Sequence, residues 1–162
     1  MGTVRLAFTP APAHVRTARL VGVAVARRAG VADAIIDEVR LAIGEACSRA
    51  VALHRRHSLT DLVEVELIAD AQFTVRVTDH APRRVPGSLD ADDDPERTDP
   101  IALLLGPATT NGGGESGVSD EDVAVGVSLT LLAGLVEDLA VIPSPDGIGS
   151  QVCMSWPAGR SR

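Results

Sequence analysis

Residues 38–51 read EVRLAIGEACSRAV, the pattern of the middle of a long amphipathic helix. Glu45 and Arg49 are four residues apart, so they lie one turn from each other on a single face. A carboxylate on the rim of such a helix is either a solvated charge or a chemical reagent. Apolar residues recur at spacings of three and four and form one stripe, namely Val39, Ile43, Ala46 or Cys47, and Ala50.

Composition predicts one soluble domain whose core is aliphatic. The chain has 162 residues, enough for one sizeable core, and is 45% hydrophobic but only 2% aromatic. Its net charge of -7 disfavours nucleic acid and anionic membranes as partners. No signal peptide pattern and no apolar run of about 18 residues is found, so we expect a cytoplasmic protein.

Apolar periodicity predicts an α+β fold, a two-layer α/β sandwich with a mostly antiparallel sheet and helices on one face. We expect residues 3–158 to form one domain, followed by a tail over 159–162. In chain order, the expected elements are an edge strand over 4–8, a helix over 13–28, a helix from 33 to 54 or 57, strands over 62–68 and 73–78, a helix over 123–135, and strands over 139–143 and 150–156.

Local signals place the helix ends and one long loop. Gly30 is expected to end the first helix, and the side chain of Asp33 to cap the start of the second. Residues 83–118 are rich in Pro and Gly and contain an acidic run over 92–94. A loop of this length in a compact domain is either functional or disordered.

The cysteines and histidines predict no metal site. Cys47 and Cys153 fit no zinc spacing and are expected to be two buried free thiols. The histidines show no ligand spacing either, which favours solvated or packing roles. They are His14, His54, His57 and His80.

Four segments of the chain carry recognisable motifs: LAIGEACSRAV over 41–51, VRVTD over 75–79, VGVSL over 125–129, and DGIGSQV over 146–152. With these motifs the chain resembles the anti-sigma-factor serine kinases, a branch of the histidine-kinase-like ATPases that share the Bergerat fold. The resemblance covers nearly the whole chain. It implies ATP or ADP as cofactor, a lid over 83–118, and a homodimer.

The resemblance also implies roles for single residues. Glu45 would be the base that orients or deprotonates the attacking hydroxyl. Asp79 would accept a hydrogen bond from the adenine amino group. Position 49 would carry an asparagine that holds magnesium. The remaining nucleotide-binding positions are Gly126, by the lid, and Gly147, Gly149 and Ser150, in the closing strand.

The chain departs from the family pattern at three of these motifs. Arg49 stands at the asparagine position, and a guanidinium has no acceptor atom with which to bind a cation. His80, Ala81 and Pro82 follow Asp79, where two glycines are expected. Ala124 stands where the first lid glycine should be. Magnesium binding is therefore the most plainly damaged function.

Three functions remain open at this point. The first is an anti-sigma factor-like regulator that acts by binding a sigma factor or an anti-sigma antagonist, with kinase activity weak or lost. The second is an active serine kinase that uses Glu45 as base. The third is a metal-independent nucleotide switch in which Arg49 contacts phosphate. Alternatively, Glu45 and Arg49 form an ordinary intrahelical ion pair.

Overall fold

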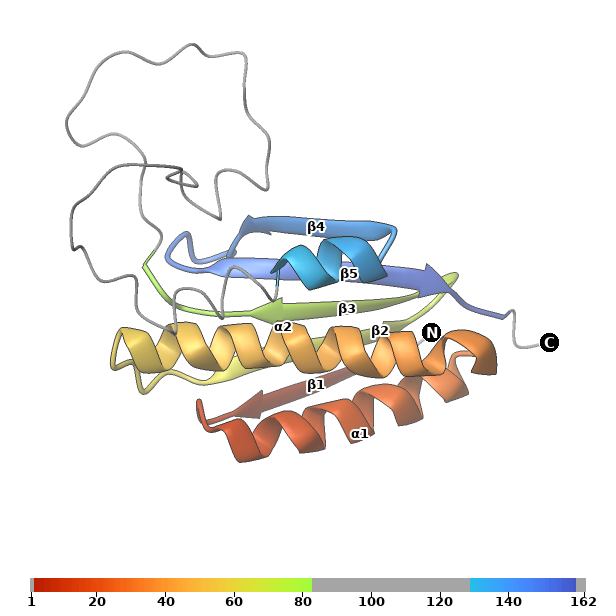
Figure 1. Ribbon diagram of the computed structural model, residues 1–162, viewed down its shortest axis with the longest axis horizontal. Helices are drawn as coiled ribbons and strands as arrows, with labels where there is room; N and C mark the ends of the chain where they lie inside the picture. Colours follow the sequence, from red (N-terminus) through yellow and green to blue (C-terminus); the bar gives the residue numbers. More distant parts are fainter. Residues whose placement is uncertain (1, 83–128, 160–162) are drawn as a thin grey trace, which may run out of the picture.

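The computed structural model describes residues 2–82 and 129–159, and these form one antiparallel sheet with helices on one face (Figure 1). The strand order is β1-β2-β3-β5-β4. None of the helices in these two ranges is long and apolar enough to cross a bilayer. The elements are β1 (Gly2–Phe8), α1 (Pro12–Arg28), the 3₁₀ helix η1 (Asp33–Ile35), α2 (Ile36–Arg56), β2 (Val63–Ala69), β3 (Gln72–Thr78), β4 (Asp138–Pro143) and β5 (Ser150–Pro157).

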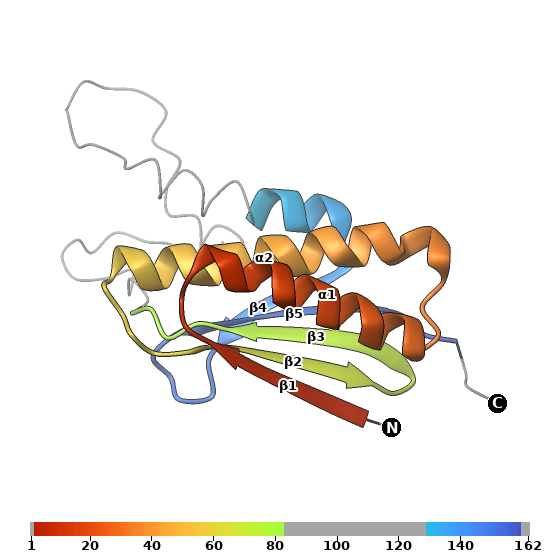
Figure 2. The ribbon, with the colours of Figure 1, turned by 90° about the horizontal axis from the view of Figure 1, so that it is seen from below.

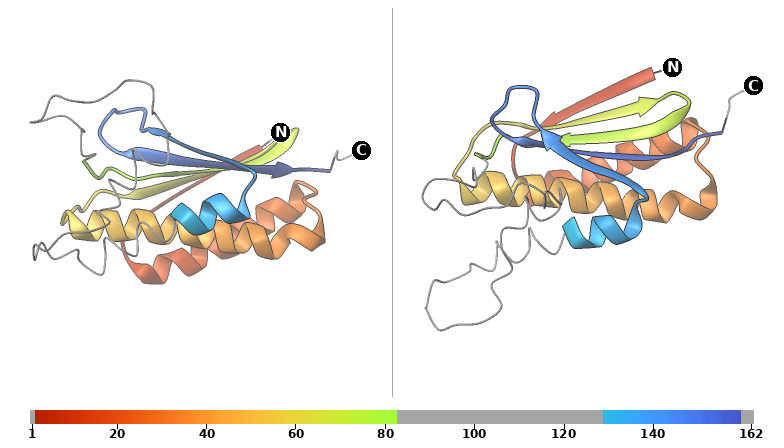
Figure 3. Two further views of the ribbon diagram at one scale, coloured as in Figure 1. Left: turned by 45° about the horizontal axis from the view of Figure 1, so that its top comes forward. Right: turned by 90° about the horizontal axis from the view of Figure 1, so that it is seen from above.

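The predicted two-layer α+β fold is confirmed. Figure 2 shows α1 and α2 packed side by side over the sheet, and a helical segment over 129–135 lies along α2 on the side away from α1. Figure 3 shows the same arrangement from two further directions. β1 is an edge strand, as its sequence predicts, and it pairs with β2. The predicted hairpin is formed by β2 and β3.

Alternating side chains explain which face of the sheet is covered. In β2, Val63, Val65 and Leu67 are buried beneath the helices. The residues between them, Glu64 and Glu66, belong to the opposite face. There Glu66 is aligned with an arginine on each neighbouring strand and pairs with both, at 2.8 Å from Arg5 and 3.6 Å from Arg76.

The stripe predicted on α2 forms the centre of the core. All of its members are buried, namely Val39, Ile43, Ala46, Cys47 and Ala50. Burial raises the pKa of the Cys47 thiol to about 12, against the opposing charge of Arg19. Cys153 is only half-buried, which corrects the expectation of two buried thiols. It alternates with the core-facing Val152 and Met154, so it belongs to the uncovered face of β5.

Gly30 ends α1 as predicted, whereas the prediction for Asp33 is wrong. Gly30 has a φ of 81° and donates to the carbonyl of Arg27 at 3.0 Å, and Val31 donates to that of Ala26 at 3.1 Å. Asp33 makes no capping hydrogen bond, because it lies in η1 and α2 begins only at Ile36. One turn of 3₁₀ helix therefore separates Asp33 from the start it was expected to cap.

Part of the predicted chain falls outside the described residues. Of the helix expected over 123–135, residues 129–135 are described and are helical. The expected lid over 83–118, together with Ala124 and Gly126, lies outside these ranges.

Candidate functional site

Three of the predicted site residues meet in one buried cluster. Arg49 comes from α2, Asp79 follows the end of β3, and Ser150 begins β5. β3 and β5 are neighbours, and the backbone N–H of Asp79 donates to the carbonyl of Ser150 at 2.9 Å. α2 crosses over this end of the sheet and brings the guanidinium of Arg49 to the same place. We refer to Arg49, Asp79 and Ser150 as the buried cluster.

The Asp79 carboxylate receives four hydrogen bonds and is 2% exposed. Its Oδ1 accepts from the backbone N–H of Ala81 at 3.0 Å and of Ser150 at 3.3 Å. Its Oδ2 accepts from the Ser150 hydroxyl at 2.6 Å and from Arg49 Nη1 at 3.3 Å. An ionised carboxylate offers about four acceptor positions, so this carboxylate is fully used by the protein itself.

Arg49 is 4% exposed and makes its ion pair with Asp79. Its Nη1 and Nη2 also donate to Ser150 Oγ, at 3.3 and 3.4 Å. Burial lowers the pKa of the guanidinium from its usual value, and the charge and hydrogen bond of Asp79 oppose that effect. Among the described residues, its Nε has no hydrogen-bond partner. The charge of Arg49 is thus directed across the fold to Asp79, instead of along α2 to Glu45.

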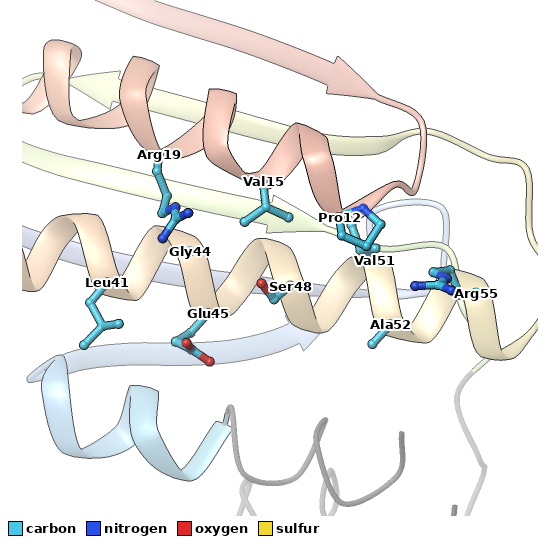
Figure 4. Close-up of a pocket in the computed structure, with 10 residues that line it drawn as sticks. All are labelled: Pro12, Val15, Arg19, Leu41, Gly44, Glu45, Ser48, Val51, Ala52 and Arg55. Carbon is cyan, nitrogen blue, oxygen red and sulfur yellow. The ribbon is translucent and has the colours of Figure 1, made fainter. Parts of the chain in front are cut away.

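Glu45, the predicted base, lies in a different environment on the same helix. It lines an open groove of about 280 Å³ over α1 and α2, with Arg19, Ser48 and Arg55 among its polar neighbours (Figure 4). The Glu45 side chain is half-buried and lies on the side of α2 away from α1. Arg49 is not among the lining residues. The structure therefore separates the predicted base from the buried cluster one turn further on.

The turn between β4 and β5 holds the last predicted residues. Gly147 has a φ of 76°, a conformation that favours glycine. A Cβ at Gly149 would overlap the backbone carbonyl of Asp79, so only glycine lets this turn approach the end of β3. Both glycines therefore have a structural reason to be present. Their predicted contact with nucleotide stays a prediction, as does that of Gly126 outside the described residues.

Asp146 fixes this turn and connects it to the residue after Asp79. Its Oδ1 accepts from the backbone N–H of Ile148 at 3.0 Å, and its Oδ2 lies 2.9 Å from His80 Nδ1. The hydrogen bond from Ile148, followed by those from Ser144 and His80, lowers the pKa of Asp146 to about 2. This contact leaves no pattern in the sequence, because 66 residues separate the two side chains.

His54 is a packing histidine that supports the same end of the sheet. It is fully buried, and its Nε2 accepts the backbone N–H of His80 at 2.9 Å. Its Nδ1 lies 3.0 Å from the Asp61 carbonyl, which requires the proton on Nδ1. His54 follows Ala50 by four residues and therefore extends the buried stripe of α2 by one turn.

The architecture corresponds to that of a class of nucleotide-dependent domains. A family model described as the histidine kinase-like ATPase domain matches residues 8–156. The chain belongs to this family. Membership in a family of ATPase domains implies nucleotide binding. A search of curated proteins finds no match.

The described residues do not fit a magnesium–nucleotide complex in the arrangement found here. Arg49 offers no lone pair to a cation, and the acceptor positions of Asp79 are taken by protein donors. Within 2–82 and 129–159, no group of three or more His, Cys, Asp or Glu side chains could hold a metal ion. The family relationship therefore implies nucleotide binding, whereas the residues at this site do not fit the magnesium ion that would accompany the nucleotide.

Proposed function

We propose that the chain is a regulatory protein-binding domain, an anti-sigma factor-like regulator of bacterial transcription whose phosphoryl-transfer activity is weak or lost. The observation that carries this proposal is the buried ion pair between Arg49 and Asp79. It replaces two functions, metal binding and base recognition, that the resemblance assigns to these positions. A domain that has lost its catalytic residues can still bind proteins through its surface, because function depends on individual sites and not on the fold.

The loss of activity follows from what phosphoryl transfer requires. This reaction depends on positioning and on neutralising the charge of the phosphates, much of it by magnesium. A guanidinium at position 49 cannot ligate the ion and repels it. The half-buried Glu45 could still reach a hydroxyl from its groove, but it would do so beside a site without the expected metal ligand.

The partner we propose is a sigma factor, an anti-sigma antagonist, or both, contacted in the cytoplasm. The net charge of -7 supports a protein partner over nucleic acid or an anionic membrane. A homodimer remains a prediction from the family resemblance.

An active serine kinase is the second candidate, and the position of Glu45 favours it. This carboxylate is half-buried and lines an open groove over α1 and α2. A kinase would need to hold its nucleotide without an asparagine at position 49 and with Asp79 already engaged. We therefore rank it below the protein-binding function.

A phosphorylation assay distinguishes the two functions. The purified chain is incubated with labelled ATP, magnesium and candidate antagonist proteins from the same genome, and binding of these proteins and of sigma factors is measured in parallel by calorimetry. We expect binding to at least one of them without phosphorylation. Robust phosphorylation of serine that is abolished by Glu45→Gln would contradict the proposal.

A further inference from the structure

The buried cluster has a property that the loss of magnesium binding does not require. Replacing the asparagine by any arginine removes the metal ligand, even if the arginine points to solvent, where its charge needs no desolvation. Instead Arg49 is 4% exposed and is anchored on Asp79 and Ser150. Burying a guanidinium is expensive unless a carboxylate compensates it, so the two side chains depend on each other.

We propose that Arg49 is a built-in competitor for the Asp79 carboxylate, so that a purine base can be recognised there only by displacing an internal cation. This inference rests on the proposed function, because it takes Asp79 as the position that would read the base. A neutral amino group donates a weaker hydrogen bond than a guanidinium does. The base would also have to leave Arg49 buried without its counter-charge. The state in which Asp79 pairs with Arg49 is therefore favoured over the state in which Asp79 binds a base.

The side chain of Ser150 strengthens the pairing of Arg49 with Asp79. Its hydroxyl donates to Asp79 Oδ2 and at the same time accepts from both Nη1 and Nη2 of Arg49. Each of the three residues is thus bonded to the other two. An asparagine at position 49 is shorter and uncharged, so it would neither compensate Asp79 nor hold the serine in this way.

The test compares nucleotide binding by the wild type and by Arg49→Asn. Calorimetric titration with ADP, without magnesium, should show at least about ten-fold tighter binding by the variant, because one hydrogen bond to a charged group is worth about that factor. Arg40→Asn is the matched control. It removes the same charge from the same helix, but from an exposed pair with Asp37. Equal affinities of the wild type and a folded Arg49→Asn would overturn the inference.

A measurement on the wild type keeps the inference testable if the variant does not fold. The backbone N–H groups of Ala81 and Ser150 report on Asp79, because both donate to its Oδ1. Their NMR signals should stay in place when ADP is added at millimolar concentration. Saturable shifts of both signals at micromolar ADP would show that the base reaches Asp79 despite Arg49, and would overturn the inference.

The two proposals can fail separately. If Arg49→Asn binds ADP no tighter and the wild type phosphorylates nothing, the competitor role fails while the protein-binding function stands. If the wild type phosphorylates an antagonist, the proposed function fails, whatever the titration shows.

Discussion

At the scale of single residues, Arg49 and Asp79 form an ion pair with a large desolvation cost, and neither residue can be replaced alone without leaving the other charge uncompensated. Both are almost fully buried, and the distance from Nη1 to Oδ2 is 3.3 Å. The attraction between two such charges does little more than offset their desolvation. The pair therefore contributes mainly to which arrangement forms, and removing one partner alone is much more destabilising than replacing both.

Asp79→Asn should be strongly destabilising, because it leaves the guanidinium of Arg49 buried without a counter-charge. We expect a loss of about 3 kcal/mol or more in the free energy of unfolding, measured with urea. The matched control is Asp37→Asn, which breaks the exposed pair with Arg40 at 2.9 Å. Its cost should stay within about 0.5 kcal/mol. Similar costs for the two variants would show that the buried pair has no special role.

The sequence predicts the chemistry of a single residue better than a contact between residues that lie far apart in the chain. Arg49 was recognisable as a non-ligand from its chemistry alone, and Glu45 from its place on the helix. The pairing of Arg49 with Asp79 was not, because 30 residues separate them and no periodic pattern relates the two. Ser150 lies 101 residues from Arg49 in the chain, and only the pairing of β3 with β5 brings it close.

At the scale of elements, the β4–β5 turn depends on its glycines for its approach to the end of β3. A Cβ at Gly149 would overlap the Asp79 carbonyl, and the backbone on both sides would have to move. We expect Gly149→Ala to lower the free energy of unfolding by about 1–3 kcal/mol, as overpacking does elsewhere.

Gly134→Ala is the control for this substitution. Gly134 belongs to the helical segment over 129–135, and a Cβ there would meet no atom of the described residues within 4 Å. Alanine also favours helix over glycine, so this variant should be neutral or more stable. If calorimetry gives both variants the same melting temperature, the close approach at Gly149 is not needed.

The same turn predicts a dependence of stability on acid. The folded state holds the pKa of Asp146 at about 2, below the usual 3.8, chiefly through the N–H of Ile148. A depressed carboxyl pKa stabilises the fold above the unfolded value and loses this effect as the pH falls toward the folded one. Asp146→Asn should therefore melt lower than the wild type above about pH 4, and the difference should vanish near pH 2. A difference independent of pH would exclude this origin.

At the scale of the whole molecule, alternation and helical spacing were sufficient to predict the fold. The strands and the two long helices lie within a few residues of their predicted bounds, because each has one buried face that repeats with its own period. The start of α2 was misplaced because the short helix η1 leaves no such pattern. The residues expected to form the lid are rich in Pro and Gly, so the sequence predicted a long loop there, with a short helix or hydrophobic anchor only over 101–105.

We propose that this member of the family has exchanged magnesium-dependent chemistry for an internal ion pair. The most direct measurement is a calorimetric titration of the wild-type chain with ATP, with and without magnesium. We predict weak binding that is the same in both conditions, because Arg49 supplies no ligand to the ion and occupies Asp79. Tight binding that requires magnesium would contradict this account.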